Sequence, residues 1–241
     1  MQAMIFAAGL GTRLYPITKD KPKALAPFMD TTLLAYNLNY LAQQGITDFI
    51  INTHHFAEKI ESYLIENNNF GYNITLSNED ILLDTAGGLA KARKYFSNEK
   101  SILLFNVDII TNIDIRKLIE YHNNNKAAAT LAIRKRDTSR YFLFNKSSEL
   151  KGWINKKTNE VKSCNDNIIE LDEFAFSGIH IINNDLIKDL KEIKESITPF
   201  YINKACSSKI VGYRHDDDYW IDCGKIESLK QAEEHLNKQS I

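Results

Sequence analysis

The sequence lacks the segments that would place a protein in or across a membrane. No apolar run among its 241 residues approaches the ~18 residues needed to cross a bilayer, and no basic, apolar and small-residue leader opens the chain. Cysteine is also scarce: Cys164, Cys206 and Cys223 are odd in number, far apart and without CxxC spacing. These absences argue against a zinc or redox motif. They predict a cytoplasmic protein with free thiols that has no membrane partner.

The chain also lacks an excess of charge of either sign. Its formal net charge is −1, with 25% charged and 44% hydrophobic residues. The hydrophobic share suffices for one sizeable domain over 1–241. A balanced charge gives no long-range field to attract nucleic acid, so we expect no nucleic-acid partner. If the ligand is an anion, the positive charge that binds it has to be local.

Strand-like and helix-like patterns alternate through the first half, about residues 1–125. Strands are predicted over 2–7, 48–52, 73–76 and 101–108, and helices around 34–41, over 57–66, from Gly87-Gly88 to Phe96, and from an Asp114 N-cap to His122. Such alternation predicts a parallel sheet with right-handed crossovers.

The pattern changes in the second half, about residues 126–241. Strands are predicted over 127–135, 140–145 and 174–182, with a hairpin over 149–162 that turns at 156–160. A closing helix begins at Ile226. Because few helices separate these strands, we expect antiparallel or mixed pairing in a lid-like half that faces the first. No linker separates the halves, so one α/β domain is expected.

A glycine-bearing loop, "FAAGLGTRLYPITKDKPK", follows the first strand. Gly9 and Gly11 resemble a dinucleotide fingerprint, but the third glycine position is Leu14, and the next strand ends in Asn52 where an acidic residue is needed. The Gly-Lys-Ser/Thr of a phosphate-binding P-loop is missing as well. Both common nucleotide motifs therefore fail, which argues against a Rossmann oxidoreductase.

The same loop carries groups that suit a polyphosphate. Its backbone N–H groups can approach phosphate oxygens, Arg13 offers several planar donors, and Lys23 offers a compact point charge. A second stretch, "LLDTAGGLAKAR", places Gly87 and Gly88 before a predicted helix. A planar base could lie there against bare backbone, although a flexible loop-to-helix junction explains the two glycines equally well.

Taken together, "FAAGLGTRLYPITKDKPKALAPF" resembles the signature of the sugar-1-phosphate nucleotidyltransferases. The similarity extends through most of the chain and is closest to short bacterial N-acetylmuramic acid 1-phosphate uridylyltransferases and mannose- or heptose-1-phosphate guanylyltransferases. It implies a Rossmann-like, mainly parallel mixed sheet flanked by helices, with a smaller mixed-strand sugar-binding half.

The resemblance also implies roles for individual residues. Arg13 and Lys23 would be catalytic, and Asp108 and Asp222 would hold Mg²⁺. Spacing alone does not separate Asp222 from the aspartates at 216–218. The nucleotide-binding residues would be Ala8, Gly9, Gly11, Thr12, Asn78, Thr85, Ala86 and Gly87.

The sugar side departs from the family pattern. Val107 stands where a glycine commonly precedes the first metal aspartate, Phe142 replaces a glycine after the tyrosine, and Glu-Lys-Pro is absent. The remaining candidates for the sugar phosphate are Arg140, Lys156 and Trp153, the last of which equally suits a half-buried hairpin position.

The expected reaction joins a nucleoside triphosphate to a sugar 1-phosphate. UTP with N-acetylmuramic acid 1-phosphate or a similar amino sugar is the leading interpretation. GTP with mannose or heptose 1-phosphate, and CTP with choline phosphate, are the alternatives. A non-catalytic nucleotide-binding module is disfavoured because Arg13, Lys23, Asp108 and Asp222 are all present.

Overall fold

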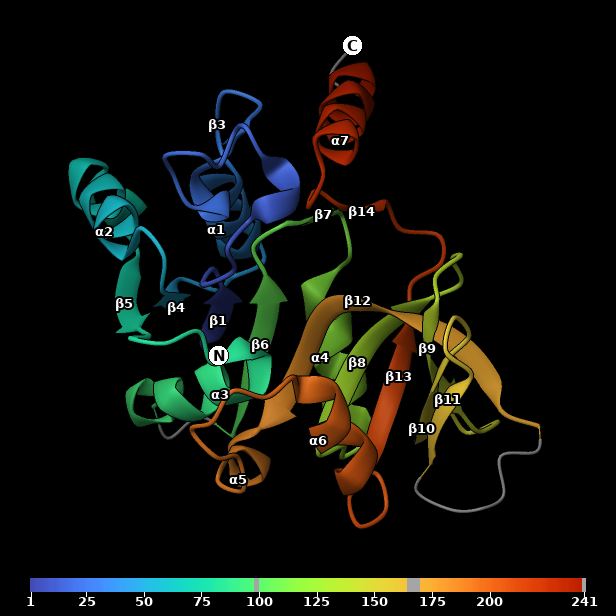
Figure 1. The fold of residues 1–241 in the computed structure, drawn as a ribbon. Coiled ribbons are helices and arrows are strands. Elements are labelled where there is room, and N and C mark those ends of the chain that lie inside the picture. Colours follow the sequence, from blue (N-terminus) through green and yellow to red (C-terminus); the bar gives the residue numbers. More distant parts are fainter. Residues whose placement is uncertain (98–99, 164–169, 240–241) are drawn as a thin grey trace.

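A ten-stranded mixed sheet forms the centre of the molecule (Figure 1). The computed structural model describes residues 1–97, 100–163 and 170–239. Eight strands follow the order β11-β10-β9-β12-β6-β1-β4-β5, while β8 pairs with β12 and β13 with β8. Their bounds are β1 (Ala3–Phe6), β4 (Asp48–Thr53), β5 (Asn73–Asn78), β6 (Ser101–Asn106), β8 (Ala129–Arg134), β9 (Arg140–Phe144), β10 (Leu150–Asn155), β11 (Glu160–Ser163), β12 (Asp172–Asn183) and β13 (Ile210–Arg214).

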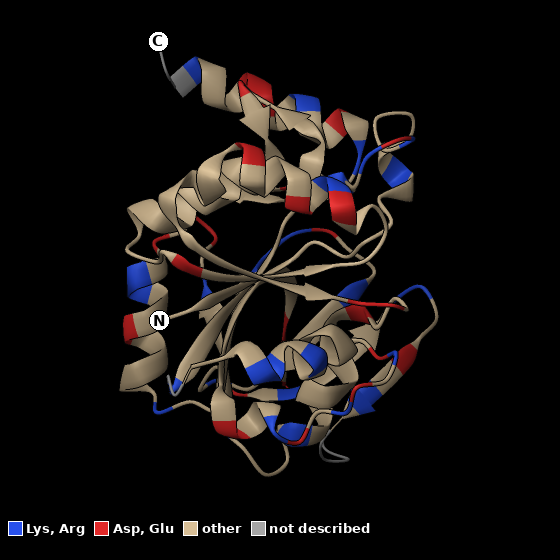
Figure 2. Cartoon of the chain, turned by 90° about the vertical axis from the view of Figure 1, so that its left-hand side faces the viewer, with Lys and Arg blue, Asp and Glu red and all other residues tan. Residues whose placement is uncertain are grey.

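Helices cover both faces of this sheet, which Figure 2 shows nearly edge on between two helical layers. The helices of the fold are α1 (Leu33–Gln43), α2 (Ala57–Glu66), α3 (Asp84–Ala92), α4 (Ile115–Asn124), α5 (Asn184–Ile187), α6 (Ile197–Lys204) and α7 (Ile226–Gln239), the last of which packs beside β7 and β14. Two small ladders, β2 (Pro27–Phe28) with β3 (Thr31–Thr32) and β7 (Ile109–Thr111) with β14 (Trp220–Asp222), complete the fold.

The predicted parallel sheet of the first half is confirmed. β1 lies between β4 and β6 and is parallel to both, and β5 is parallel to β4. Along β6 the buried side chains alternate between the two faces: Ile102 and Leu104 pack on one side, and Leu103 and Phe105 on the other. A strand buried on both faces reads as a continuous apolar run, which is why its sequence signal is strong.

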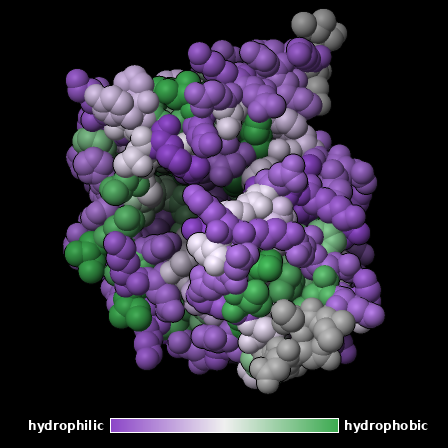
Figure 3. All heavy atoms as spheres, turned by 45° about the vertical axis from the view of Figure 1, so that its right-hand side comes forward, coloured by the Kyte–Doolittle hydropathy of each residue, from purple (hydrophilic) through white to green (hydrophobic). Residues whose placement is uncertain are grey.

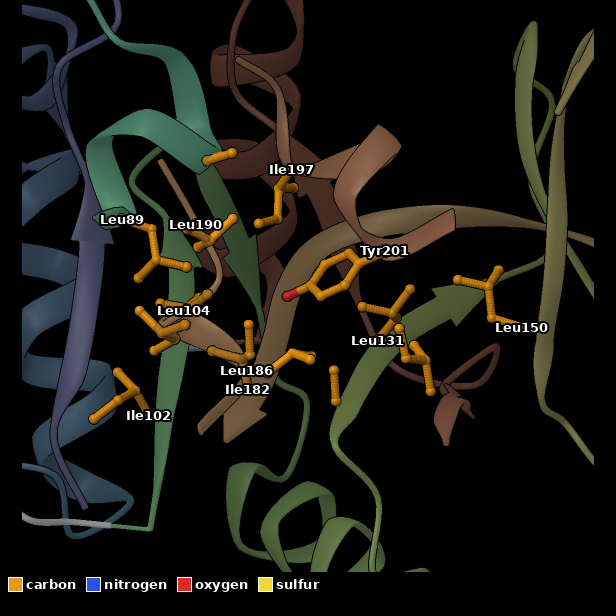
Figure 4. Close-up of a cluster of buried hydrophobic side chains, with 14 of the residues drawn as sticks. Leu89, Ile102, Leu104, Leu131, Leu150, Ile182, Leu186, Leu190, Ile197 and Tyr201 are labelled. Carbon is orange, nitrogen blue, oxygen red and sulfur yellow. The ribbon is translucent and has the colours of Figure 1, made fainter. Parts of the chain in front are cut away.

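The cluster on the first side lies between the sheet and α3, α5 and α6. Figure 4 shows Leu89 of α3 and Tyr201 of α6 pointing toward Ile102 and Leu104 of β6 and Leu131 of β8. Tyr201 is fully buried, and its hydroxyl pairs with His180 Nδ1 at 3.0 Å. Strands from both halves of the chain therefore contribute to one apolar cluster.

The mixed pairing predicted for the second half is confirmed, but its expected position is wrong. β12 runs antiparallel to β6 and to β8, and β13 is parallel to β8. The second half therefore extends the sheet of the first half instead of forming a separate layer that faces it. The 12-residue length of β12 makes this possible, because the strand pairs with β6 and with β9 at different points.

Local signals predict some element boundaries better than others. The bounds of α2 and the Asp114 N-cap of α4 are confirmed, with Asp114 Oδ1 accepting from the Lys117 N–H at 3.1 Å. The predicted start of α3 at Gly87 is wrong, because the helix begins at Asp84 and contains both Gly87 and Gly88. Both positions require glycine. A Cβ on Gly87 would collide with the Ile193 carbonyl oxygen, and a Cβ on Gly88 would lie 2.6 Å from Glu79 Oε1.

The cysteine prediction holds for one residue. Cys223 is free and buried, Cys206 is disulfide-bonded, which corrects the expectation of a free thiol, and Cys164 lies outside the described residues. No helix in the described part of the chain is long and apolar enough to span a membrane. The face in Figure 3 is largely hydrophilic, with small hydrophobic areas between charged and polar side chains.

Three buried histidines should make stability depend on pH. Burial lowers the pKa of His122, lowers that of His180 to about 3, and together with the Arg134 charge lowers that of His215 to about 4. The unfolded chain therefore binds more protons below pH ~6.5, and stability falls as the pH falls. His180 and His215 should each cost about 2 kcal/mol of stability between pH 7.5 and pH 5.

Urea denaturation of His180→Gln at both pH values tests this, with the exposed His55 replaced by Gln as the control. The His180 variant should lose less stability on acidification than the wild type, whereas the His55 variant should match the wild type. Equal losses in all three proteins would contradict the assignment.

Candidate active site

A cavity of about 410 Å³ opens at the carboxyl ends of β1, β4 and β6. Ligand sites of open α/β sheets lie at this edge. Seven residues predicted from the sequence line it: Ala8, Gly9, Arg13, Lys23, Thr85, Asp108 and Asp222. The structure thus brings together side chains separated by more than half of the chain.

The glycine-bearing loop folds back on itself to present its two cations. Gly11 adopts the left-handed conformation with φ of 67°, and its carbonyl oxygen accepts from Thr18 Oγ1 at 2.8 Å. A Cβ on Gly11 would lie 2.9 Å from Lys23 Cβ. Gly11 therefore does not line the cavity but makes room behind Lys23, and Thr12 is exposed at the start of a short 3-10 turn that carries Arg13.

Lys23 forms an ion pair with Asp108, and both side chains are largely buried, at 15% and 9% exposed. Strand β6 ends at Asn106, so Asp108 lies in the connection to β7 and not at the strand end that the sequence predicted. A compact ammonium beside a carboxylate in a poorly solvated wall is a strong electrostatic contact, because little water screens it.

The second aspartate is held opposite the first by backbone pairing. Strands β7 and β14 are antiparallel, with Asp222 paired to Ile109, the residue after Asp108. The Cys223 N–H donates to the Asp108 carbonyl oxygen at 2.7 Å. Burial and then the Asp108 charge raise the pKa of Asp222, while a hydrogen bond from the Gly224 N–H and the charges of Lys23 and Arg13 oppose that rise.

Gly224 is a site residue that sequence reasoning missed. A Cβ there would lie 2.5 Å from Arg13 Nη2 and 2.7 Å from Asp222 Oδ1. The guanidinium of Arg13 therefore lies against bare backbone beside Asp222. The available signal was a glycine two positions after a candidate metal aspartate, but nothing local pointed to Arg13, which is far away in the sequence.

The two aspartates fit a hard divalent cation. Mg²⁺ is commonly held by one or two carboxylates, with phosphate and water oxygens as its other ligands. The repulsion between Asp108 and Asp222 is of the kind that a shared cation removes. Within the described ranges, no group of three or more His, Cys, Asp or Glu side chains is arranged to hold a metal ion.

The predicted base-binding residues Thr85, Ala86 and Gly87 lie in the first turn of α3. Thr85 lines the cavity, but its Oγ1 accepts from the Ile197 N–H at 2.9 Å. Ala86 and Gly87 are buried, and the Ala86 N–H donates to the Glu195 carbonyl oxygen at 2.9 Å. They hold the segment 193–197 against α3, and that segment carries Lys194 to the cavity.

Asn78 does not line the cavity, whereas its neighbour Glu79 does. Glu79 is buried; its Oε1 accepts from Asn52 Nδ2 at 2.7 Å, and its Oε2 accepts from the Leu83 N–H at 2.9 Å. Asn52 Oδ1 in turn accepts from the Ala7 N–H at 2.8 Å. Sequence reasoning missed this network because its members come from separate strands and loops.

The predicted sugar-phosphate candidates lie elsewhere. Arg140 and Trp153 line a separate cavity of about 170 Å³ beside the start of α6. Lys156 pairs with Glu173 at 2.5 Å and lies 5.0 Å from the Tyr141 ring centroid. None of the three lines the cavity that contains Asp108, because β9 and β10 extend the sheet away from β6.

Comparison with known proteins identifies a family for the chain. The sequence model described as nucleotidyl transferase matches residues 2–239. Over 238 residues the chain is 28% identical to the D-glycero-alpha-D-manno-heptose 1-phosphate guanylyltransferase of Aneurinibacillus thermoaerophilus, covering 98% of each chain. It is 33% identical over 142 residues to a UTP–glucose-1-phosphate uridylyltransferase of Synechocystis sp.. That match covers only 54% of this chain and 36% of the Synechocystis protein.

A solved structure shows the same fold. HddC from Yersinia pseudotuberculosis complexed with GMP-PN superposes with a TM-score of 0.79 at 21% sequence identity, and the match covers 98% of this chain and 99% of that chain. The α/β fold expected from the sequence is thereby confirmed. The family resemblance is confirmed separately by the sequence model that matches residues 2–239.

The contact between Gly224 and Arg13 can be tested through stability. Gly224→Ala should lower the free energy of unfolding by about 1–2 kcal/mol, because the new methyl group forces Arg13 or Asp222 to move. Gly9→Ala is the matched control, since a Cβ there meets nothing within 4 Å. Urea denaturation measures both, and equal stability of the two variants would refute the contact.

Proposed function

Because the chain belongs to the nucleotidyl transferase family, we propose that it joins a nucleoside triphosphate to a sugar 1-phosphate, releasing pyrophosphate. The observation that carries this proposal is the convergence of Arg13, Lys23, Asp108 and Asp222 on one cavity at the carboxyl ends of the parallel strands. Two cations suit the phosphates of one substrate, and two carboxylates suit the divalent ion that accompanies them.

The proposed chemistry is direct attack by a phosphate oxygen of the sugar 1-phosphate on the α-phosphorus. That oxygen is already ionised at neutral pH, so no general base is required. Lys23 contacts the α-phosphate, and Arg13 contacts the departing β- and γ-phosphates, with backbone N–H groups near Ala8 and Gly9 beside them. Catalysis then consists of positioning and charge stabilisation.

Mg²⁺ is the proposed cofactor, held by Asp108 and Asp222. When bound, it neutralises negative charge around the reacting phosphorus. The Lys23 ammonium, which pairs with Asp108 in the structure, would lie beside the same phosphates. The antiparallel pairing of β7 with β14 keeps both carboxylates in place, so little reorganisation is needed when substrates bind.

GTP is the proposed nucleotide, and heptose or mannose 1-phosphate is the proposed acceptor. The relative matched over 98% of both chains is a manno-heptose 1-phosphate guanylyltransferase, whereas the uridylyltransferase match covers about half of the chain. UTP with N-acetylmuramic acid 1-phosphate, the leading interpretation from sequence, becomes the second candidate, and CTP with choline phosphate the third. Residues of about 1–125 would bind the nucleotide, and those of about 126–241 would supply most of the sugar-binding half.

Glu79 gives a physical reason for guanine. Its carboxylate is an acceptor-only group in the cavity wall, and each oxygen has accepted one hydrogen bond in the structure. Guanine presents two neighbouring donors on one edge, N1–H and the 2-amino group, while uracil presents only N3–H. An acceptor-only carboxylate therefore favours guanine over uracil.

The reaction itself is tested by combining GTP, UTP, CTP, dTTP and ATP with a panel of sugar 1-phosphates and choline phosphate in the presence of Mg²⁺. Pyrophosphate release should be fastest with GTP and a manno-configured sugar. Folded protein that is silent in every combination would refute the enzyme assignment, and a clear preference for UTP would move the second candidate to first place.

Loss of either aspartate should abolish turnover without unfolding the protein. Asp108→Asn and Asp222→Asn should each lower kcat by at least about 100-fold, because the charge at the reacting phosphorus is no longer balanced. Asp172→Asn is the control, since this exposed carboxylate pairs only with Lys146 among the described contacts. Steady-state pyrophosphate release and circular dichroism measure the two effects, and full activity of either variant would contradict the metal assignment.

The role of Glu79 predicts a change in base preference. Glu79→Gln replaces an acceptor with a group that also donates, so the ratio of kcat/KM for GTP to that for UTP should fall by about tenfold or more, equivalent to about 1.4 kcal/mol. Glu61→Gln, on the exposed side of α2, should leave the ratio unchanged. An unchanged ratio in the Glu79 variant would remove Glu79 from base recognition.

A further inference from the structure

Strand β12 contains an irregularity next to the candidate active site. Its register with β8 shifts between Phe176 and His180, and Gly178 there has a left-handed backbone with φ of 74°. A bulge of this kind leaves backbone groups without partners in the ladder and often lies beside a functional site. The bulge lies just before Ile179, which pairs with Phe105 of β6.

Side chains from other elements satisfy the freed carbonyl groups. Arg136 Nη2 donates to the Phe176 carbonyl oxygen at 3.2 Å, and Trp220 Nε1 donates to the Ser177 carbonyl oxygen at 2.9 Å. The Arg136 guanidinium also lies 4.8 Å from the Trp220 ring centroid. Because Trp220 and Asp222 share strand β14, these contacts fix the bulge relative to the candidate metal site.

Gly178 leaves space for the side chain of Asn106, the last residue of β6. A Cβ on Gly178 would lie 2.7 Å from Asn106 Nδ2 and 3.2 Å from its Cγ. Asn106 lines the same cavity as Asp108. Its carboxamide forms no hydrogen bond with any residue that the structure describes, whereas the amide of Asn52 in the same wall is bonded on both sides.

The sheet order places Asn106 on the acceptor side of the cavity. The proposed nucleotide contacts lie around the loop after β1 and the ends of β4 and β5, on one side of β6. Gly178 belongs to β12, which is the neighbour of β6 on the other side. A carboxamide offers one donor group and one acceptor, which matches two adjacent hydroxyl groups of a sugar ring.

We infer that Asn106, seated against Gly178, binds hydroxyl groups of the acceptor sugar and helps to select the acceptor. This inference rests on the proposed function, since it assumes a sugar phosphate as the second substrate. The inference gives the β12 bulge a function. The missing Cβ of Gly178 leaves room for the Asn106 amide, and the hydrogen bonds to the Phe176 and Ser177 carbonyl oxygens fix the bulge in position.

The test measures KM for each substrate of Asn106→Ala, using the nucleotide and sugar phosphate that the wild type turns over fastest. KM for the sugar phosphate should rise about tenfold or more, while KM for the nucleotide stays within about twofold. Asn124→Ala, at the exposed end of α4, is the matched control and should change neither value. An increase confined to the nucleotide KM, or no increase, would overturn the inference.

Monodeoxy analogues of the sugar phosphate provide a second measurement that begins with the wild type. The wild type should lose kcat/KM on one or two analogues, and Asn106→Ala should not lose further on those same analogues, because the contact is already gone. Equal fractional losses in both proteins would overturn the inference. In either case turnover by the wild type separates this result from failure of the proposed function, which would appear as no turnover with any sugar phosphate.

Discussion

The pairing of β7 with β14 is the constraint on which the candidate site depends. It holds two carboxylates, Asp108 and Asp222, in a poorly solvated cavity where their charges repel. The positive charges of Lys23 and Arg13 offset that repulsion. Each of these side chains packs against a glycine that has no Cβ to block it, Gly11 for Lys23 and Gly224 for Arg13. The site is therefore an electrostatic balance that substrates and a divalent cation would rearrange, rather than a preformed set of nucleophiles and bases.

The features that could be predicted from the sequence are those that a local residue pattern encodes. The buried strands of the parallel sheet, the bounds of α2 and the Asp114 cap follow from periodicity and capping chemistry, which act within a few residues. The cations of the first loop could also be proposed, because Arg13 and Lys23 lie on one short stretch. Asp108 and Asp222 could be paired only through a family resemblance, since nothing in their spacing records the ladder between β7 and β14.

The residues that escaped prediction depend on contacts between distant segments. Gly87 looked like the start of a helix, but its size is set by the Ile193 carbonyl oxygen. Glu79 was missed because its contact with Asn52 joins two separate parts of the chain. The expected lid failed for a similar reason: a strand as long as β12 can serve two groups of partners, and no local signal states which ones it chooses.

The length of β12 has a consequence for how such a protein can change over generations. One strand pairs with β6, whose end lies beside the candidate site, and also with β8 and β9 of the second half of the chain. Exchange of either half between relatives would have to break a continuous ladder. On the proposed role of Asn106, new acceptors would be reached more readily by single substitutions around the bulge than by recombination, and diversity among relatives should concentrate where backbone pairing is already interrupted.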